Sequence, residues 1–324
     1  MQNIEVYQKL FVQYLENFTK DREPKNLYNP VNYILKLGGK RLRPVLTLVS
    51  AELFGTTANR ALDAALSIEV FHNFSLIHDD IMDAAPLRRG KPTVHEKWNI
   101  NTGILSGDAM LILAYQLFEN YKSNTFQALA KLFSKTALEV CEGQQYDIDF
   151  ETRDDVTIPE YLKMIEYKTA VLVGTAMKMG AIVAEASEED QDAVYNFGRY
   201  LGIAFQLQDD YLDAFGNPKA FGKQVGGDIL ENKKTYLYLK TLELGSKNQQ
   251  TLLVKTTHNN AISDAKKISA IKTLFTNSGA ANATQDAVKS YTSKAFLVLE
   301  TLQISKEKKQ LLQLFGQQLM NRVM

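Results

Sequence analysis

The stretch "LIHDDIMDAAPLRRG", residues 76–90, governs the interpretation of the whole chain. It holds three aspartates, Asp79, Asp80 and Asp83, followed by the basic pair Arg88–Arg89. In a helix, residues four apart lie on one face, so the first and third aspartates point the same way and Asp80 lies about 100° round the axis. Carboxylates this close repel one another, and we expect cations to compensate them.

The same spacing returns in "FQLQDDYLD", residues 205–213, which contains Asp209, Asp210 and Asp213. Two solvated acidic helix ends are the simplest explanation, because aspartate favours helix ends. Two chance matches to Asp-Asp-x-x-Asp are nevertheless improbable in a chain of 324 residues with 37 acidic side chains in all. The repetition indicates a shared chemical purpose.

The hydrophobic pattern around both motifs is helical. Apolar residues recur three and four positions apart, which predicts helices over 4–18, 61–77, 104–118, 126–141, 160–183, 190–212 and 287–302. Asn29–Pro30 predicts a helix start, and Thr157–Glu160 and Ser187–Asp190 have the form of capping boxes. The alternation typical of strands is missing, as are linkers and repeats. We expect one large all-α domain over residues 1–324.

Composition excludes several classes of function. Lys+Arg and Asp+Glu both number 37, so no global charge favours nucleic acid or an anionic membrane. The single cysteine, Cys141, excludes an intramolecular disulfide framework and a cysteine-rich zinc site. The first residues lack the apolar core of a signal peptide, and no apolar run reaches about 18 residues. A cytoplasmic protein without a membrane span is the expectation.

Paired carboxylate clusters are suited to hard divalent cations. Mg²⁺ is typically held by one or two carboxylates together with substrate phosphates. Zinc sites typically use His and Cys ligands, and this chain has only four histidines and one cysteine. Neither acidic segment has the glycine of a calcium-binding loop. Nucleotide-binding glycine motifs are missing too, so a different diphosphate is favoured. The basic run "GGKRLRP" at residues 38–44 could bind such a group, since arginine and lysine are the usual phosphate ligands.

Together these motifs resemble those of the trans (all-E) polyprenyl diphosphate synthases, the chain-elongating isoprenyl transferases of the farnesyl and geranylgeranyl type. The resemblance rests on both acidic motifs, on Gly-Gly-Lys-x-x-Arg-Pro and on "RRGKPTVH" beyond the first acidic motif, and it spans residues 38 to about 234. It implies an all-α bundle around a central cavity, the isoprenoid synthase fold, in a homodimer.

The resemblance also implies a role for each matching residue. Asp79 and Asp83 would bind Mg²⁺ on one wall and Asp209 on the other, with three ions per site when substrate is bound. The supporting carboxylates would be Asp80, Asp210 and Asp213. The allylic diphosphate would be held by Arg88, Lys168, Thr169, Gln206, Lys223 and Lys233, and isopentenyl diphosphate by Lys40, Arg43, His72 and Arg89.

The implied reaction joins isopentenyl diphosphate to an allylic diphosphate: dimethylallyl, geranyl or farnesyl. The metals draw off the allylic diphosphate, the isopentenyl double bond attacks the carbocation, and a proton is lost. His78, beside the first motif, is either structural or a support for its neighbours. Lys234 could replace Lys233, because the spacing from Lys223 is one residue longer than in some relatives. His95 and Trp98 receive no assignment.

Product length should depend on the helix that carries the first motif, because a growing apolar tail must run along it. In the resembling family, the residues five and four before the motif commonly close the tail cavity; here these are Phe74, large, and Ser75, small. Phe71 and Phe118 could close it further on, or simply belong to the core. One aromatic stop predicts an all-trans C15–C20 product, with geranylgeranyl slightly favoured over farnesyl.

Three other functions are compatible with a helical chain of this kind. A terpene cyclase of the same fold normally has one acidic motif and lacks the second basic set. A non-catalytic partner subunit of a prenyl synthase usually loses an acidic motif. A purely structural helical protein would need neither. Because both acidic motifs and both basic sets occur in this chain, the synthase is the favoured function.

Overall fold

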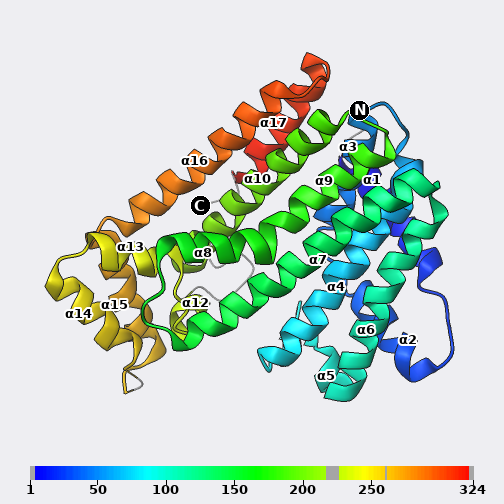
Figure 1. The fold of residues 1–324 in the computed structure, drawn as a ribbon. Coiled ribbons are helices and arrows are strands. Elements are labelled where there is room, and N and C mark those ends of the chain that lie inside the picture. Colours follow the sequence, from blue (N-terminus) through cyan, green and yellow to red (C-terminus); the bar gives the residue numbers. More distant parts are fainter. Residues whose placement is uncertain (1–3, 217–225, 260, 321–324) are drawn as a thin grey trace. The chain divides into compact units, whose positions relative to one another are not determined.

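The structure is a computed structural model that describes residues 4–216, 226–259 and 261–320. The described chain is almost entirely helical, with one short strand pair (Figure 1), which confirms the predicted all-α class. The first helices are α1 (Ile4–Phe18), α2 (Lys25–Lys36), α3 (Leu42–Leu53), α4 (Leu62–Met82), α5 (Val94–Lys97), α6 (Ile100–Gln116) and α7 (Ser123–Thr152). The later ones are α8 (Ile158–Ile165), α9 (Val171–Val183), α10 (Glu188–Phe215), α12 (Gly227–Leu230), α13 (Tyr236–Leu244), α14 (Lys247–Thr257), α15 (Asp264–Asn277), α16 (Ala280–Thr301) and α17 (Lys306–Met320).

Shorter elements connect these helices. The 3₁₀ turns are η1 (Ala58–Ala61) and η2 (Leu117–Asn120), and η3 (Glu166–Ala170) is a π-helical turn. Strands β1 (Leu87–Arg88) and β2 (Lys91–Pro92) form an antiparallel pair just beyond the first acidic motif. The pair was not predicted, because two residues per strand are too few to show an alternating pattern.

The chain divides into two compact units. The first comprises Met1–Lys135 and Thr175–Tyr195, and the second comprises Thr136–Gly174 and Asn196–Met324. Helices α7, α9 and α10 therefore each contribute residues to both units. A single domain over residues 1–324 stays a prediction.

Helix α4 is the centre of the first unit. It contacts α1, α2, α3, α5 and α6 and has buried residues on all its sides, as expected of a helix that is apolar around its circumference. Glycines on α6 allow a close approach: a Cβ at Gly107 would lie 2.3 Å from His78 Nε2, and one at Gly103 would lie 2.8 Å from Ile81 Cδ1. The acidic end of α4 is thereby fixed against α6.

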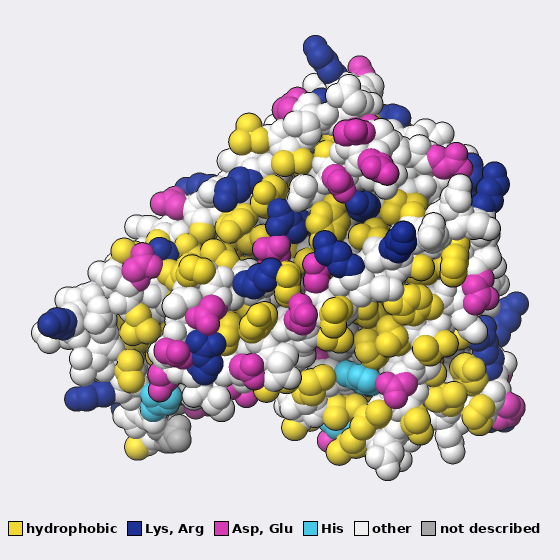
Figure 2. Space-filling model, viewed as in Figure 1, with side chains coloured by type: hydrophobic (Ala, Val, Ile, Leu, Met, Phe, Trp, Pro, Cys, Tyr) yellow, Lys and Arg dark blue, Asp and Glu magenta, His cyan; other side chains and the backbone are white. Residues whose placement is uncertain are grey.

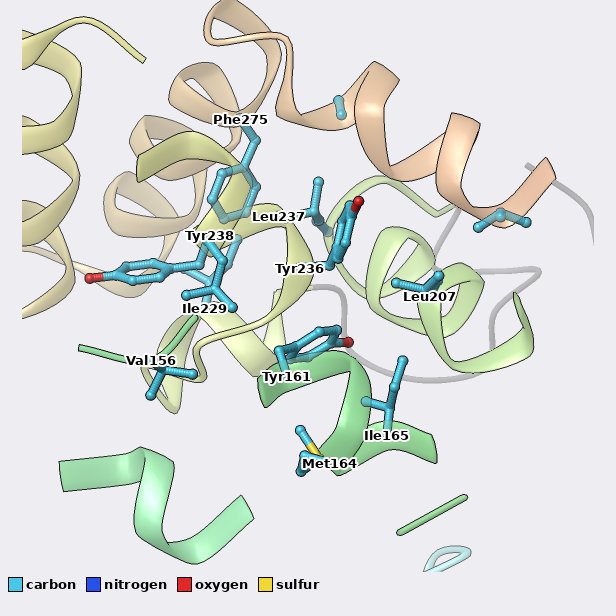
Figure 3. Packing of buried hydrophobic residues seen from close by; sticks show 14 of the residues in the cluster. Val156, Tyr161, Met164, Ile165, Leu207, Ile229, Tyr236, Leu237, Tyr238 and Phe275 are labelled. Atoms are coloured by element: carbon cyan, nitrogen blue, oxygen red, sulfur yellow. The ribbon is translucent and has the colours of Figure 1, made fainter. Parts of the chain in front are cut away.

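The second unit has a hydrophobic cluster that joins α8, α10, α13 and α15. Figure 3 shows Tyr161, Leu207, Tyr236 and Phe275 packed together in it, and each of these side chains is buried. The rings of Tyr161 and Tyr236 have centroids 6.1 Å apart. This cluster positions α8 beside the part of α10 that carries the second acidic motif.

The predicted helix starts have mixed outcomes. The Thr157 capping box is confirmed, since the Glu160 N–H donates to Thr157 Oγ1 at 3.4 Å and the Thr157 N–H donates to Glu160 Oε2 at 2.8 Å. Ser187 Oγ likewise accepts from the Asp190 N–H at 3.1 Å. The start at Asn29–Pro30 is wrong. Pro24 provides an extended N-cap one turn earlier, so α2 begins at Lys25 and Pro30 lies inside it.

Two further helix predictions are corrected. The helix predicted over 160–183 is interrupted by the π turn η3, whose i→i+5 hydrogen bonds differ from those of the 3.6-residue helix that the periodicity assumes. The helix predicted over 104–118 ends at Gln116, and Phe118 lies on the 3₁₀ turn η2. Among the helices of the described ranges, none combines the length and apolarity that crossing a membrane would require.

Candidate active site

The first acidic motif lies at the C-terminal end of α4. Asp79 and Asp80 are in its last turn, and Asp83 is the C-cap residue. Arg88, on β1, donates from Nε to both carboxylate oxygens of Asp80 at 2.8 Å and reaches Asp79 Oδ2 at 3.4 Å. Asp80 is only 1% exposed. Burial raises the pKa of Asp80, and Arg88 opposes that shift. In this structure Arg88 compensates the charge of Asp80.

The basic run at residues 38–44 lies close to the second arginine of the pair. Arg89 donates to the Gly38 carbonyl. Gly38 and Gly39 both have positive φ, 82° and 120°, and a Cβ at Gly39 would lie 2.8 Å from the Arg89 guanidinium carbon. The glycine pair is needed for this backbone and this contact. Arg43 Nη1 lies 3.2 Å from His72 Nε2, and Lys40 is exposed. The structure thus brings Arg43 and His72 together as one pair.

Arg41, the middle member of the run, has a structural role that the sequence did not reveal. It is the N-cap residue of α3 and donates to Glu69 on α4 and to the Leu35 carbonyl. Both members of this ion pair are buried, and Asn73 Nδ2 donates to Glu69 Oε1 at 3.1 Å. A buried pair is tolerated only when its hydrogen bonds are satisfied. The pair holds the start of α3 against α4.

His72 is held in its neutral form. Its pKa is lowered well below the usual 6.5, first by burial and then by the charges of Arg43, Arg89, Arg88 and Arg41. Since the neighbouring guanidinium can only donate, Nε2 of the neutral ring accepts and the proton lies on Nδ1.

Lys168 and Thr169 lie in the π turn η3 of the second unit. Lys168 Nζ is 2.6 Å from Asp147 Oδ2 on α7. A Cβ at Gly143 would lie 2.2 Å from the Lys168 backbone nitrogen, so α7 can approach this turn only at a glycine. Asp147 was missed by the sequence analysis. Its position four residues after Gly143 was the available signal, since that spacing places both on one helix face.

The second acidic motif lies near the C-terminal end of α10. Asp210 is 6% exposed, accepts from the Tyr161 hydroxyl through Oδ2, and accepts from Gln206 Nε2 through Oδ1 at 3.0 Å. Burial, followed by the charge of Asp228, raises the pKa of Asp210 to about 8 against the effect of these donors. Asp213 Oδ2 accepts the Asp228 N–H at 3.1 Å. Asp209, which directly precedes Asp210, is partly exposed.

A cavity of about 180 Å³ lies beside this motif. Its polar lining includes Asp147, Lys168, Thr169, Gln206, Asp210, Lys233 and Lys234. The predicted allylic residues of the second unit therefore share one cavity, except Lys223, which lies outside the described residues.

The two candidate lysines differ in what they contact. Lys234 Nζ donates to the carbonyls of Phe150 and Glu151, at 3.1 and 3.4 Å, at the C-terminal end of α7, a position where cations are favourable. Lys233 lies 3.1 Å from Glu231, and nearby acidic charges raise its pKa against the effect of burial. These contacts favour Lys233 as the phosphate ligand.

The predicted chain-length residues belong to an aromatic cluster in the first unit. Phe71 and Phe74 have ring centroids 5.5 Å apart, and Phe133 of α7 lies 5.1 Å from Phe71 and 5.3 Å from Phe118. All four rings are buried. Ser75 is partly buried and donates from Oγ to the His72 carbonyl at 2.8 Å. Phe133 was missed, because nothing in its local sequence connects it with α4.

His78 contacts this cluster from the next turn of α4. Its ring centroid lies 4.7 Å from that of Phe74, and Nε2 lies 3.3 Å from the Ile104 carbonyl and 3.9 Å from Asp108. These contacts fit the structural alternative for His78.

The carboxylates fit Mg²⁺. Within residues 4–216, 226–259 and 261–320, no three His, Cys, Asp or Glu side chains are grouped closely enough to hold a metal alone. Mg²⁺ does not require such a cage, since one or two carboxylates with phosphate and water oxygens complete its octahedron. Each acidic motif supplies oxygen ligands of this kind.

The family is established by comparison with known proteins. The model for the family described as polyprenyl synthetase matches residues 24–274. A geranylgeranyl pyrophosphate synthase of Geoglobus acetivorans is 44% identical over 240 residues, covering 73% of this chain and 75% of that protein. A geranylfarnesyl diphosphate synthase of Aeropyrum pernix is 34% identical over 309 residues, covering 93% and 95%. The chain belongs to the polyprenyl synthetase family.

A solved structure described as a geranylgeranyl pyrophosphate synthase shows how close the similarity is. It is 55% identical, covers 100% of both chains and has a TM-score of 0.96. Within a family of Mg²⁺-dependent enzymes, the chain is therefore a short-chain trans-prenyltransferase with the isoprenoid synthase fold. These similarities favour the synthase over the terpene cyclase and the non-catalytic partner subunit.

The neutral His72 predicts a pH dependence of stability. In the unfolded chain this histidine binds a proton with a pKa near 6.5, whereas the folded protein keeps it neutral. The free energy of unfolding should therefore decrease as the pH falls through this value. The expected decrease between about pH 7.5 and about pH 5.5 is about 1.4 kcal/mol. We expect His72→Asn to remove this part of the slope in urea unfolding. An unchanged slope would show that His72 titrates alike in both states.

Proposed function

We propose that this enzyme condenses isopentenyl diphosphate with an allylic diphosphate and releases an all-trans C20 prenyl diphosphate and pyrophosphate. The observation that carries the proposal is the occurrence in one chain of two acidic motifs and two basic sets, each with the side-chain contacts described above. A geranylgeranyl product is supported by the names of similar proteins and by the occurrence of one aromatic residue, Phe74, at the two positions five and four before the first motif.

In this proposal the metal ligands are Asp79 and Asp83 from the first motif and Asp209 from the second. Bound Mg²⁺ would act as a Lewis acid on the departing diphosphate oxygens. Asp80, Asp210 and Asp213 support these ligands, since each of the three accepts hydrogen bonds from protein donors. Three ions per site is the number that the family resemblance implies.

The basic and polar residues form two sets, one for each diphosphate substrate. Arg88, Lys168, Thr169, Gln206, Lys223 and Lys233 are proposed for the allylic diphosphate, and Lys40, Arg43, His72 and Arg89 for isopentenyl diphosphate. Arginine binds phosphate through paired hydrogen bonds, and its guanidinium stays charged even when buried. With both diphosphates bound, the isopentenyl double bond would attack the allylic carbocation, and the cation that results would lose a proton to the departed pyrophosphate.

Loss of a single metal-binding carboxylate tests the function directly. Asp79→Ala and Asp209→Ala should each lower turnover by on the order of 10²-fold or more, because each removes charge used mainly in the transition state. The measurement is pyrophosphate release with isopentenyl and geranyl diphosphates at saturating Mg²⁺. Asp286→Ala, at an exposed aspartate, is the matched control. Turnover near wild type in either motif variant would contradict the proposal.

We propose that Phe74 limits the length of the product by stopping the growing prenyl chain. It precedes Asp79 by five helical residues, about 7.5 Å along the axis, and Phe71, Phe133 and Phe118 lie behind it in the same aromatic cluster. A tail that reaches Phe74 would meet a packed wall rather than a single side chain.

Phe74→Ala should shift the product distribution towards chains longer than C20, measured by mass after incubation with farnesyl and isopentenyl diphosphates. The variant should lose about 3–5 kcal/mol of stability, so its folding must be checked first. Phe126→Ala, which changes an exposed aromatic residue of α7, should leave the products unchanged. A folded, active Phe74 variant with the wild-type product would show that Phe74 only packs the core.

We further propose that the enzyme is a homodimer that pairs through α6. Leu105 and Ile112, two turns apart on that helix, are 61% and 59% exposed, and Ile104 is also exposed. Hydrophobic side chains gather over this part of the surface (Figure 2). Light scattering of the wild-type protein should give twice the mass of one chain, and light scattering of the Leu105→Glu variant should give the mass of a single chain. Leu314→Glu on α17 is the control, and a monomeric wild type would refute the proposal.

A further inference from the structure

We propose that Tyr161 is a positioning residue for the second acidic motif: its hydroxyl fixes the buried Asp210 carboxylate and thereby the direction in which Asp209 faces a metal ion. The inference rests on the proposed function, since it assigns Asp209 to the metal. Neither the acidic motif nor the basic sets include Tyr161.

The first step concerns the hydrogen bonds that the Asp210 carboxylate accepts. Tyr161 donates to Oδ2 and Gln206 Nε2 donates to Oδ1 at 3.0 Å, so each carboxylate oxygen has a protein donor. Thr169 Oγ1 in turn donates to Gln206 Oε1 at 3.3 Å. That bond determines which end of the amide faces Asp210. A carboxylate held from both sides cannot rotate freely.

The second step concerns the surroundings of Tyr161. Its ring is 2% exposed and packs in the hydrophobic cluster of the second unit, where phenylalanine would fill almost the same space (Figure 3). A buried hydroxyl needs a hydrogen-bond partner, and here that partner is the carboxylate. The neighbouring Tyr236 belongs to the same cluster, but its hydroxyl points in a different direction (Figure 3).

The third step is the effect on Asp209. The two aspartates are consecutive on α10, so hydrogen bonds that hold the Asp210 side chain also restrain the helical turn that carries Asp209. Asp213 and Asp228 lie close to Asp210, and all three line one small cavity. Without the Tyr161 hydroxyl, the Asp210 carboxyl group would be held through Gln206 from one side only. Loss of a partner that orients a ligand typically lowers metal affinity by about 10–100-fold.

The test is a titration of the intact protein with MnCl₂ in the presence of inorganic pyrophosphate, with free Mn²⁺ measured by electron paramagnetic resonance. The ion of interest is the Mn²⁺ that the wild-type protein binds and the Asp209→Ala variant does not. We expect Tyr161→Phe to raise the half-saturating Mn²⁺ concentration for that ion by about tenfold or more. Tyr236→Phe removes a hydroxyl from the same cluster and should match wild type.

The outcomes separate the inference from the function on which it rests. If Asp209→Ala loses no Mn²⁺, the proposed metal role of Asp209 fails, and with it the proposed function of the motif. If it does lose Mn²⁺ but Tyr161→Phe titrates like wild type, Tyr161 only packs the core and the inference is overturned. The Michaelis constant for isopentenyl diphosphate should change less than twofold in Tyr161→Phe, whereas general unfolding would alter every parameter.

A double variant tests whether Tyr161 acts through Asp210. When Tyr161 acts through Asp210, its removal should matter less once Asp210→Asn has already altered that carboxylate. The Mn²⁺ effects of the two changes should therefore be clearly less than multiplicative in the double variant. Independent, multiplicative effects would overturn the inference.

Discussion

The burial of one carboxylate in each acidic motif is the constraint on which the rest of the site depends. Asp80 and Asp210 occupy the same place in their motifs, and both are almost fully removed from solvent. A buried charge costs much free energy unless it is paired or hydrogen-bonded, so each motif requires a partner from elsewhere in its unit. That requirement links α4 to β1 in the first unit and α10 to α8 in the second.

The two motifs meet this requirement by different chemistry. Arg88 brings a full positive charge to Asp80, whereas Tyr161 and Gln206 bring only neutral donors to Asp210. A neutral donor orients a carboxylate without cancelling its charge. Burial and the charge of Asp228 raise the pKa of Asp210 to about 8 against the effect of these donors, whereas the charge of Arg88 opposes the upward shift that burial causes at Asp80. The hydrogen-bond partners of Asp210 thus orient its carboxyl group without supplying a compensating charge.

Most of the fold, and the identity of the motifs, could be predicted from sequence because both are local. Helical periodicity and the capping box at Thr157 depend on residues within one or two turns, and the structure confirms them. Partners distant in the chain were missed: Glu69 for Arg41, and Asp147 for Lys168. A spacing rule has no means of finding a contact that the tertiary fold creates.

Local rules also gave a wrong result in two places. Asn29–Pro30 predicts a helix start, yet Pro24 already supplies an extended N-cap, so α2 begins at Lys25 and contains Pro30. The π turn η3 is packed against a glycine on another helix, Gly143, which leaves room for its backbone. This second feature becomes intelligible only when the neighbouring helix is known, and it lies directly in the candidate site.

The basic residues of the first unit complete the electrostatic logic. Burial lowers the pKa of Arg43 and of Arg89, and nearby arginines lower both further, while Glu69 opposes the shift. His72 is kept neutral, so it adds no further charge to this group. The fold therefore holds like charges together at both kinds of site, cations around Arg43 and anions around each acidic motif. Such preorganised charge is costly without ligand and is relieved by a ligand of the opposite sign. In the proposed function, diphosphate would relieve the first and a divalent cation the second.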